Sequence, residues 1–394
     1  MKFSVLICLL IAAFFTQSSL AADSSKLSDL IKSVQASHSD GFVITQNGKI
    51  LAQTSSAEPE ELIETMSMTK SFVSLAVGFL LEDHLISSID QPVYFFYPEW
   101  NVGFKKQVTL RHLLEHTSGI SANPTTQDIY GQPDFIRYAL DAQIITPPGK
   151  VFFYNNKALN LLAGIAERAS GRKIDVYLKE KLFEPLGIRK FLWTTDKVGN
   201  PSGMAGLQMT ASDLAKVGQF MLDQGKVRGK QLLNANWIQA SFAPSSSNSS
   251  YGLLWRRSDD REYKYDESLI GIYEAAGLPS IHIAKLRIVA QMGSMPLNRF
   301  NQSIIDTFGS VDEVTRFMQF VTDHQLPHYR LIAGTDQAYA AEGYLGQFLV
   351  IIPAKQIVAV RTIKSSSVVR AGYDSCPDFI HDVLKLSAST DGSY

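Results

Sequence analysis

The sequence predicts an α+β fold, in which an antiparallel sheet built from both ends of the chain and flanked by terminal helices lies beside a mainly helical lobe. Two alternating apolar runs joined by Asn47-Gly48 predict a hairpin near the N-terminus. Two β-branched runs around residues 353–356 predict a second hairpin near the C-terminus, and helical patterns fill the chain between them. Because a sheet must bury its apolar face, the simplest architecture joins both hairpins in one sheet.

The first residues are typical of a secretory signal peptide. Lys2 precedes an apolar run over residues 3–15, and residues 19–21 (SLA) fit the small-x-small rule for cleavage. The run is too short to span a bilayer comfortably. We therefore expect residues 1–21 to be removed and the mature protein to be exported, either periplasmic or secreted, with no membrane span left.

The remaining elements follow in order along the mature chain, residues 22–394. Residues 25–38 place apolar side chains on one helical face, and residues 67–83 form a helix that is apolar all round and is expected to be buried. The patterns divide the chain into a sheet lobe (about 22–66 and 339–394), a helical lobe (about 67–255) and an insertion (about 256–338). A cleft between two lobes is a favoured ligand site.

A serine and a lysine lie three residues apart where the buried helix begins. In residues 64–71, ETMSMTKS, Ser67 and Lys70 share one face of the predicted helix. The serine hydroxyl would lie at the helix N-terminus, where N–H groups and the helix dipole favour negative charge. A lysine in apolar surroundings is costly unless it is paired or used, and burial lowers its pKa. The alternative is a capping serine beside a lysine that extends to solvent.

A second group of polar residues follows a Pro-Pro-Gly turn. Residues 151–154, VFFY, are strand-like, and an apolar helix begins directly after them. Asn156 is a reasonable N-cap for this helix. The chemical alternative makes Tyr154 a proton shuttle and Asn156 an amide donor to a substrate carbonyl.

Five motifs in this order resemble the serine β-lactamase and penicillin-binding-protein-like family, in particular its class C-related branch of esterases, D-aminopeptidases and aminohexanoate-dimer hydrolases. The motifs are SMTK, VTLRHLLEHTSGI, PPGKVFFYNN, GLQMTASDLAKVGQFMLDQG and GYLGQFLVIIPAKQIVAVR. They cover roughly residues 40–255 and 339–364. The S-x-x-K element carries the acylating serine in such enzymes. The resemblance implies a β-lactamase/transpeptidase-like fold.

Carried over residue by residue, the resemblance implies a serine hydrolase that acts through an acyl-enzyme. Ser67 would be the nucleophile, Lys70 its proton partner and Tyr154 a second acid or base, while Asn156 would contact the substrate. Water would then release the acid. No cofactor and no metal ion are implied, and the expected partner is a small ester or amide, with a peptidoglycan fragment as a further candidate.

The last motif of the family, Lys-Thr-Gly on the strand beside the cleft, should fall at residues 341–343. N–H groups of Ser67 and Tyr344 would then form the oxyanion hole, and Gly343 would let the substrate approach the strand closely. Ala341 replaces the lysine, which in the family binds a substrate carboxylate and helps to stabilise the tyrosine as phenolate. We therefore expect an esterase or amidase rather than a β-lactamase or DD-peptidase, with Lys70 as the base.

The insertion is a second departure from the family pattern. Residues 253–255, LLW, normally precede the last motif by a short connection, whereas here residues 256–338 intervene. They include strand-like patches within residues 273–294 and a helix-like run at residues 310–324. Long insertions in compact domains are often functional, so this one could roof the cleft or dock a partner, but no motif identifies its role.

Two other classes of protein stay open. Residues 112–116 match H-x-x-E-H, an inverted zinc-peptidase pattern in which His112 and His116 would share a metal on one helix face, with Glu167 as a conceivable third ligand. The family resemblance makes these histidines scaffold instead. The other class is a binding protein that kept the fold and lost the chemistry, which Ala341 and the insertion permit. A formal net charge of −1 gives no indication of a nucleic-acid partner.

Overall fold

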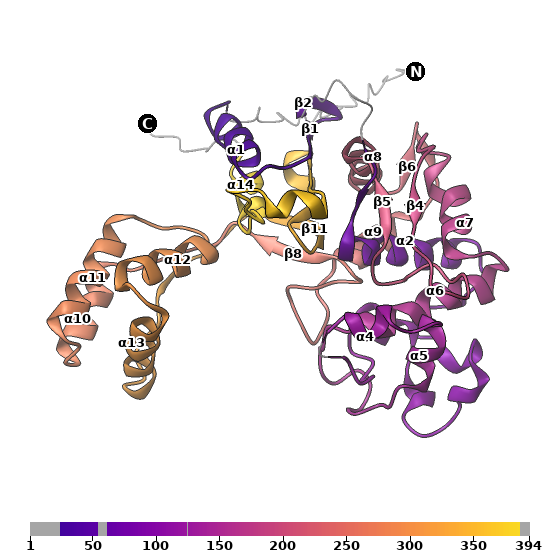
Figure 1. The fold of residues 1–394 in the computed structure, drawn as a ribbon, viewed down its shortest axis with the longest axis horizontal. Coiled ribbons are helices and arrows are strands. Elements are labelled where there is room, and N and C mark those ends of the chain that lie inside the picture. The colour runs from indigo at the N-terminus through magenta and orange to yellow at the C-terminus, as the bar shows by residue number, and fades with distance from the viewer. Residues whose placement is uncertain (1–23, 54–60, 124, 387–394) are drawn as a thin grey trace, which may run out of the picture.

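The computed structural model describes residues 24–53, 61–123 and 125–386, and Figure 1 shows how they are arranged. The expected signal peptide, residues 1–21, lies outside the described residues. Within the three described ranges, no helix has both the length and the apolar character needed to cross a membrane.

A six-stranded antiparallel sheet joins the two ends of the chain. Its strand order is β2-β1-β13-β12-β11-β8, and β1 pairs with β13 from Gly41 opposite Thr362 to Gln46 opposite Ile357. The predicted α+β fold class is therefore confirmed. The strands are β1 (Gly41–Gln46), β2 (Lys49–Gln53), β8 (Arg256–Asp259), β11 (Gln337–Gly343), β12 (Gln347–Ile352) and β13 (Ile357–Thr362).

Both predicted hairpins turn where the sequence places them. Asn47 and Gly48 have left-handed φ values of 51° and 72°, the conformation that a two-residue type I′ turn requires. In the second hairpin, a 3-10 turn (Pro353–Lys355) and Gln356, with φ of 52°, connect β12 to β13. Local turn chemistry thus sets the register of the sheet at both chain ends.

Helices cover both faces of the sheet. On one face, α1 (Ser24–Ala36) and α14 (Phe379–Leu384) pack in a cluster that includes Leu30, Val350 and Phe379. On the other face, α8 (Ala211–Leu222) lies close to the strands. A Cβ atom at Gly218 of α8 would approach Val358 Cγ1 to 2.4 Å, so glycine is what permits this approach.

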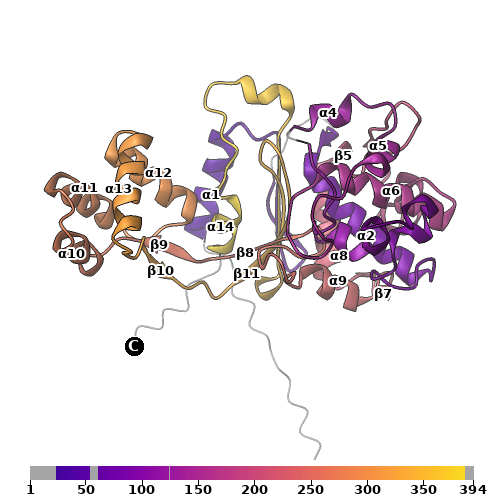
Figure 2. The same cartoon turned by 90° about the horizontal axis from the view of Figure 1, so that it is seen from below.

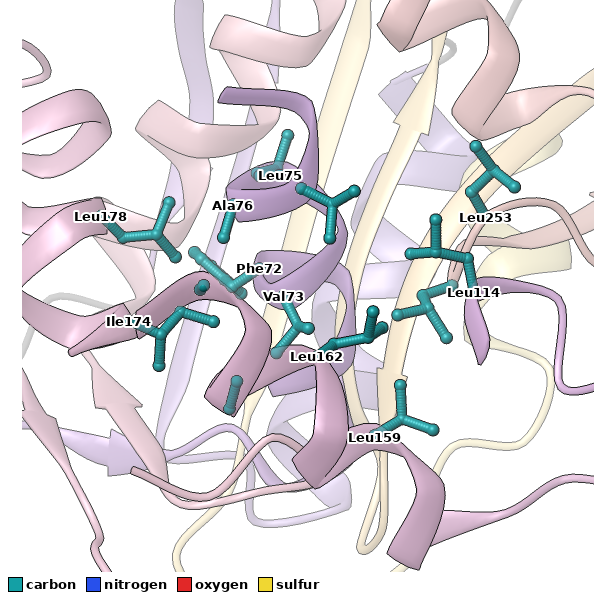
Figure 3. Close-up of a cluster of buried hydrophobic side chains, with 14 of the residues drawn as sticks. Phe72, Val73, Leu75, Ala76, Leu114, Leu159, Leu162, Ile174, Leu178 and Leu253 are labelled. Carbon is teal, nitrogen blue, oxygen red and sulfur yellow. The ribbon is translucent and has the colours of Figure 1, made fainter. Parts of the chain in front are cut away.

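Helix α2 (Thr69–Glu82) runs through the helical lobe. Every residue from Thr69 to Leu80 is buried, which confirms the helix predicted from its all-round apolar pattern. Figure 3 shows Phe72 and Val73 among side chains of α6 (Asn156–Ser170) and α7 (Ile174–Leu178). We call this core the main cluster; α2 and the turn before it also contact β11, so the start of α2 lies at the edge of the sheet.

Short elements complete the two lobes. The strands are β3 (Ile63–Glu64), β4 (Leu192–Trp193), β5 (Leu207–Met209), β6 (Lys226–Val227) and β7 (Lys230–Gln231). The helices are α3 (Leu110–Leu114), α4 (Gln127–Tyr130), α5 (Phe135–Asp141) and α9 (Ala235–Phe242). Single 3-10 turns occupy Met66–Met68, Val93–Phe95, Pro98–Trp100, Lys105–Gln107 and Ser365–Val369, and a π-helical turn occupies Lys179–Phe183.

Residues 260–336, which we call the insertion lobe, form a separate body with its own hydrophobic cluster. Figures 1 and 2 show this lobe to one side of the sheet, joined to it at β8 and β11. Its elements are β9 (Glu262–Lys264), α10 (Glu267–Ala275), α11 (Ser280–Gln291), α12 (Leu297–Phe308), α13 (Val311–Asp323) and β10 (Arg330–Ile332). Its cluster shares no residue with the main cluster.

The structure confirms one pattern in the insertion and corrects another. The helix-like run at 310–324 is confirmed as α13. The strand-like interpretation of residues 273–294 is wrong, because this segment contains the end of α10 and all of α11. Ile283, Leu286 and Val289 recur every third residue and are buried in the lobe's cluster, so burial at helical spacing outweighs the strand preference of branched side chains.

Polar contacts attach the insertion lobe to the terminal helix. Arg299 of α12 donates to both carboxylate oxygens of Asp382, at 2.6 and 2.8 Å, and lies 3.2 Å from Asp378. Asn298 donates to the carbonyl of Pro377 at 3.1 Å. The lobe is therefore tied to α14 as well as to the two strands that lead into it.

Candidate active site

Ser67 lies in the 3-10 turn directly before α2. Met66, the residue before it, has a left-handed φ of 50°, a strained conformation of the kind found at functional sites. Hydrogen bonds hold the turn on both sides: Thr65 Oγ1 donates to the Leu207 carbonyl at 2.9 Å, and Thr69 Oγ1 donates to the Met66 carbonyl at 2.8 Å. The strained turn is thus anchored to β5 and to α2.

Lys70 lies one turn along from Ser67, as the i, i+3 spacing predicts. Its side chain is buried, and its Nζ donates to Ser67 Oγ at 2.8 Å and to the Met204 carbonyl at 2.7 Å. Burial lowers the pKa of Lys70 to about 7. Both the ammonium and the neutral amine are therefore populated at neutral pH, beside a serine hydroxyl.

Tyr154 faces the same serine from the segment before α6. Its hydroxyl hydrogen bonds with Ser67, and Lys70 Nζ lies 5.0 Å from the centre of its ring. Burial raises the pKa of Tyr154 to about 12. The hydrogen bond with Ser67 opposes this rise, and the charge of Glu342 adds to it. The phenol is thus protonated at neutral pH. Residues 151–154 form no strand, contrary to their strand-like pattern.

His116 holds the segment that carries Tyr154, a role that the sequence did not reveal. Its carbonyl accepts from Phe153 N at 2.8 Å and its Nδ1 accepts from Asn155 N at 3.2 Å, one contact on each side of Tyr154. The His116 and Tyr154 rings lie 4.6 Å apart. Burial, together with the charge of Lys70, lowers the pKa of His116 to about 3, so the imidazole is neutral.

The geometry departs from what the H-x-x-E-H pattern needs. Helix α3 ends at Leu114, and His116 has a left-handed φ of 56°, so His112 and His116 do not share one helix face. His112 Nδ1 instead accepts from Thr109 N in a capping box, and Glu115 lies 3.7 Å from Arg111. Among the described residues, no group of three or more His, Cys, Asp or Glu side chains is arranged to hold a metal ion.

Asn155, rather than Asn156, caps helix α6. Asn155 Oδ1 accepts from Ala158 N at 3.1 Å, and its Nδ2 donates to the Ile120 carbonyl at 2.7 Å. The N-cap interpretation of Asn156 is therefore wrong by one residue. Asn156 is the first residue of α6 and is half-buried, and its contact with substrate stays a prediction.

The end of strand β11 faces the serine turn. A Cβ atom at Gly343 would lie 2.3 Å from the Thr65 carbonyl oxygen and 3.0 Å from Met66 Cβ, so glycine lets the protein's own backbone approach here. Tyr344 follows with an exposed side chain. Ala341 is buried in the main cluster, where it presents no charge to the cleft. The oxyanion roles of the Ser67 and Tyr344 N–H groups stay predictions.

A cleft of about 550 Å³ lies between these elements. It brings Ser67, Tyr154, Gly343 and Tyr344 together, whereas Asn156 does not line it. The cleft also contains an ion pair, because Arg256 of β8 contacts Glu342 of β11 at 3.2 Å. Its lining residues are Ser67, Ser71, Phe152, Tyr154, Asn248, Ser250, Tyr251, Leu254, Arg256, Ala340, Glu342, Gly343 and Tyr344.

The serine of the S-x-x-K element lies before a buried helix, at the edge of the antiparallel sheet. The fold that places it there is that of β-lactamase-like and penicillin-binding-protein-like proteins. The chain belongs to the beta-lactamase family, whose model matches residues 27–372. The suspected resemblance is thereby confirmed.

Individual relatives and solved structures are similar to this chain at low sequence identity. A 6-aminohexanoate-dimer hydrolase from Paenarthrobacter ureafaciens is 26% identical over 250 residues, which cover 58% of this chain and 63% of the relative. The octameric penicillin-binding protein homologue from Pyrococcus abyssi has a TM-score of 0.55 and 20% identity, covering 92% of this chain and 76% of that one. A class C beta-lactamase mutant has a TM-score of 0.57 and 16% identity, covering 91% and 96%.

The chain spans less than two thirds of the length of the first curated relatives that it matches, between 40% and 63%. The two solved structures named above are below 25% identical to this chain, so the likeness to them is one of fold.

Proposed function

We propose that this protein is an exported serine hydrolase that cleaves an ester or amide bond through a covalent acyl-enzyme on Ser67. The observation that carries the proposal is the 2.8 Å contact between the buried Lys70 Nζ and Ser67 Oγ, which lines the cleft. With the pKa of Lys70 lowered to about 7, a neutral amine is available at neutral pH to take the serine proton. Export rests on the signal-like residues 1–21.

The proposed acylation uses Ser67 as nucleophile, Lys70 as base and Tyr154 as acid. Lys70 takes the proton of the Ser67 hydroxyl as Oγ forms a bond to the substrate carbonyl carbon, and the N–H groups of Ser67 and Tyr344 stabilise the oxyanion. Tyr154, protonated at neutral pH, donates its proton to the leaving oxygen or nitrogen as that bond breaks. The Lys70 ammonium then returns a proton to the phenolate.

Deacylation uses the same groups on a water molecule. The neutral Lys70 amine takes a proton from water as its oxygen attacks the acyl carbonyl carbon. The bond to Ser67 Oγ breaks, the serine regains a proton from the Lys70 ammonium, and the acid leaves. No step needs a metal ion or a cofactor.

We favour ester and amide substrates over β-lactams and D-Ala-D-Ala peptides. Buried Ala341 offers no cation to a substrate carboxylate, where the family pattern has a lysine. Two relatives carry the names 6-aminohexanoate-dimer hydrolase and N-acetylmuramyl-L-alanine amidase, which describe cleavage of amide bonds. Amides therefore belong in the substrate panel beside simple esters.

Intact-mass detection of an acyl adduct tests this proposal. The panel comprises nitrophenyl esters, D-amino-acid amides, a cephalosporin and a muropeptide. We expect an adduct or turnover with esters or amides in the wild-type protein and neither in Ser67→Ala. The matched control is Ser74→Ala, which removes a buried hydroxyl of α2 outside the cleft and should leave acylation intact.

Three other outcomes would assign the protein to another class. Faster acylation by the cephalosporin than by any ester would make it a β-lactam-recognising protein in spite of Ala341. Activity that is lost with a chelator but retained in Ser67→Ala would indicate a metallopeptidase. No turnover, together with no labelling of Ser67 by a fluorophosphonate, would indicate a binding protein without chemistry.

A further inference from the structure

We propose that the cleft selects substrates that carry a positively charged ammonium group, which Glu342 and the aromatic side chains around it bind. This inference rests on the proposed function, because it names the substrate class of the same site. Its evidence is the set of side chains that line the cleft, and it does not depend on which bond Ser67 cleaves.

Glu342 places a carboxylate at the reacting end of the cleft. It is the residue before Gly343 at the end of β11, and only 27% of its side chain is exposed. Its negative charge raises the pKa of both Tyr154 and Tyr251, so the carboxylate lies within electrostatic reach of the phenol that faces Ser67. Burial raises the pKa of Glu342 itself and the charge of Arg256 opposes this rise, so the ionised carboxylate depends on a cationic partner.

Aromatic side chains line the same cleft as this carboxylate. Phe152, Tyr154, Tyr251 and Tyr344 all line the cleft, and the Phe152 and Tyr251 rings lie 5.5 Å apart. Ring faces attract cations, and sites that recognise quaternary ammonium groups combine several such rings. A cleft lined by a carboxylate and several aromatic rings is therefore suited to an ammonium group.

Arg256 is the cation that Glu342 contacts within the chain. It lies on the edge strand β8 in register with Ala340, its contact to Glu342 is 3.2 Å, and 53% of its side chain is exposed. Ion pairs this exposed stabilise a protein little, because solvent screens them. A substrate cation can therefore replace Arg256 as the partner of Glu342, with the guanidinium turning to solvent.

The charge at this end of β11 is opposite to the family pattern. The resemblance expects a lysine at position 341, and the chain has buried Ala341 there and an acid one residue later. Selectivity for an ammonium group follows from the loss of the lysine and the gain of the neighbouring acid.

Three nitrophenyl esters of equal chain length test the inference. They are the butyrate, the 4-trimethylammoniobutyrate and the hemisuccinate, which end in a neutral, a cationic and an anionic group. With each kcat/KM divided by the rate of hydroxide hydrolysis of the same ester, we expect the cationic ester to be preferred over the neutral one by about tenfold, through contact of its quaternary ammonium group with aromatic rings and a carboxylate rather than through hydrogen bonds. A preference for the hemisuccinate would overturn the inference.

Two substitutions then separate recognition from structure. Glu342→Gln should lower the ratio of kcat/KM for the cationic ester to kcat/KM for the neutral ester by about tenfold. The ratio is the readout because Glu342 also raises the pKa of Tyr154, and an effect on that acid changes both esters alike. Arg256→Gln should increase the preference for the cation, because it removes the competing guanidinium. The controls Glu274→Gln, on α10, and Arg261→Gln, beyond β8, make the same charge changes outside the cleft and should change neither ratio. Equal losses for all three esters in Glu342→Gln would overturn the inference.

A binding measurement distinguishes failure of this inference from failure of the proposed function. In the Ser67→Ala background, calorimetry with the three matching N-methyl amides reports recognition without turnover. A cation preference that Glu342→Gln abolishes would support the inference even if the wild-type protein hydrolyses no ester. Hydrolysis of esters without any cation preference would support the proposed function and overturn the inference.

Discussion

At the scale of single residues, the cleft depends on a lysine that is held out of water. Lys70 is 1% exposed and pairs with a hydroxyl and a carbonyl rather than with an acid, so nothing in direct contact compensates its charge. Burial of an uncompensated ammonium favours its neutral form. Burial of Lys70 therefore costs stability and gives an amine that can act as a base, a combination that is common at active sites.

The pH dependence of activity should report the titration of Lys70. Below its pKa of about 7 the ammonium cannot accept the serine proton, so kcat/KM for a neutral nitrophenyl ester should fall about tenfold per pH unit below 7 and level off above it. Tyr154, with a pKa of about 12, stays protonated across this range. Steady-state rates between pH 5 and 9 measure this profile.

Tyr154→Phe provides the control for this assignment. It should lower the plateau and leave the ascending limb at the same pH. Loss of the limb in Tyr154→Phe, or a limb near the ordinary lysine pKa of about 10.4, would contradict the assignment of the base to Lys70.

We expect His116 to support the segment that carries Tyr154 through the hydrogen bond that its Nδ1 accepts, rather than through the volume of its ring. His116→Leu leaves the buried Asn155 N–H unpaired, and we expect a loss of about 1–3 kcal/mol in the free energy of unfolding and a lower kcat. His116→Asn keeps an acceptor and tolerates the left-handed φ of 56°, so it should lose less. Urea unfolding and measurement of kcat report both effects. A smaller loss in His116→Leu than in His116→Asn would show that side-chain packing matters more than the hydrogen bond.

At the scale of elements, two segments beside Ser67 approach each other without side chains between them. The end of β11 lies against the turn before α2, and Gly343 is the point of contact. The turn itself is strained at Met66 and tied by Thr65 to β5. Three elements, far apart in the sequence, therefore determine where Ser67 Oγ points.

Gly343→Ala should separate these elements. The new Cβ would lie 2.3 Å from the Thr65 carbonyl oxygen, so β11 or the serine turn must shift. Displacements of about 1 Å at a reacting centre cost about 10²-fold in rate, and we expect a loss of this size in kcat/KM.

Gly271→Ala is the matched control for this prediction. A Cβ at Gly271, in α10, meets nothing within 4 Å, and alanine there should stabilise the helix by about 0.5–1 kcal/mol without affecting turnover. Ester hydrolysis and thermal unfolding of both variants measure the difference. Wild-type turnover in Gly343→Ala would show that the contact is not needed for catalysis.

At the scale of the whole molecule, three large hydrophobic clusters divide the described residues, and a fourth, small one surrounds Phe135. The main cluster joins the helical lobe to one face of the sheet, a second lies under α1 and α14, and the third belongs to the insertion lobe. The insertion lobe connects to the rest through β8, β11 and the contacts between α12 and α14. Its stability is therefore expected to be partly independent of the active-site cleft.

Phe317→Ala should unfold the insertion lobe locally. Phe317 is fully buried in the third cluster, and deleting its ring should cost about 3–5 kcal/mol. Hydrogen exchange should rise in α10–α13 while turnover of a neutral ester stays within about threefold. Phe72→Ala, in the main cluster, should instead raise exchange in α2 and reduce turnover. Equal increases in both regions after Phe317→Ala would show that the molecule unfolds as one unit.

Features encoded by neighbouring residues could be predicted from the sequence. Asn47-Gly48 indicated the first hairpin, and the spacing of Ser67 and Lys70 placed both on one side of a helix start. The local sequence pattern gave wrong predictions where burial in the tertiary structure determined the conformation. Branched residues in α11 indicated strand and form helix, and the cap of α6 is Asn155 rather than its neighbour.

The sequence by itself determined the fold class, the family and the serine–lysine pair, because turn chemistry, apolar periodicity and i, i+3 spacing act over a few residues. Only the tertiary structure decided the charge of the cleft and the lowered pKa of Lys70. Glu342 and Arg256 lie 86 positions apart in the sequence, and Met204, whose carbonyl accepts a hydrogen bond from Lys70, lies 134 positions from that lysine. Burial and electrostatic coupling depend on such distant neighbours, which no local pattern encodes.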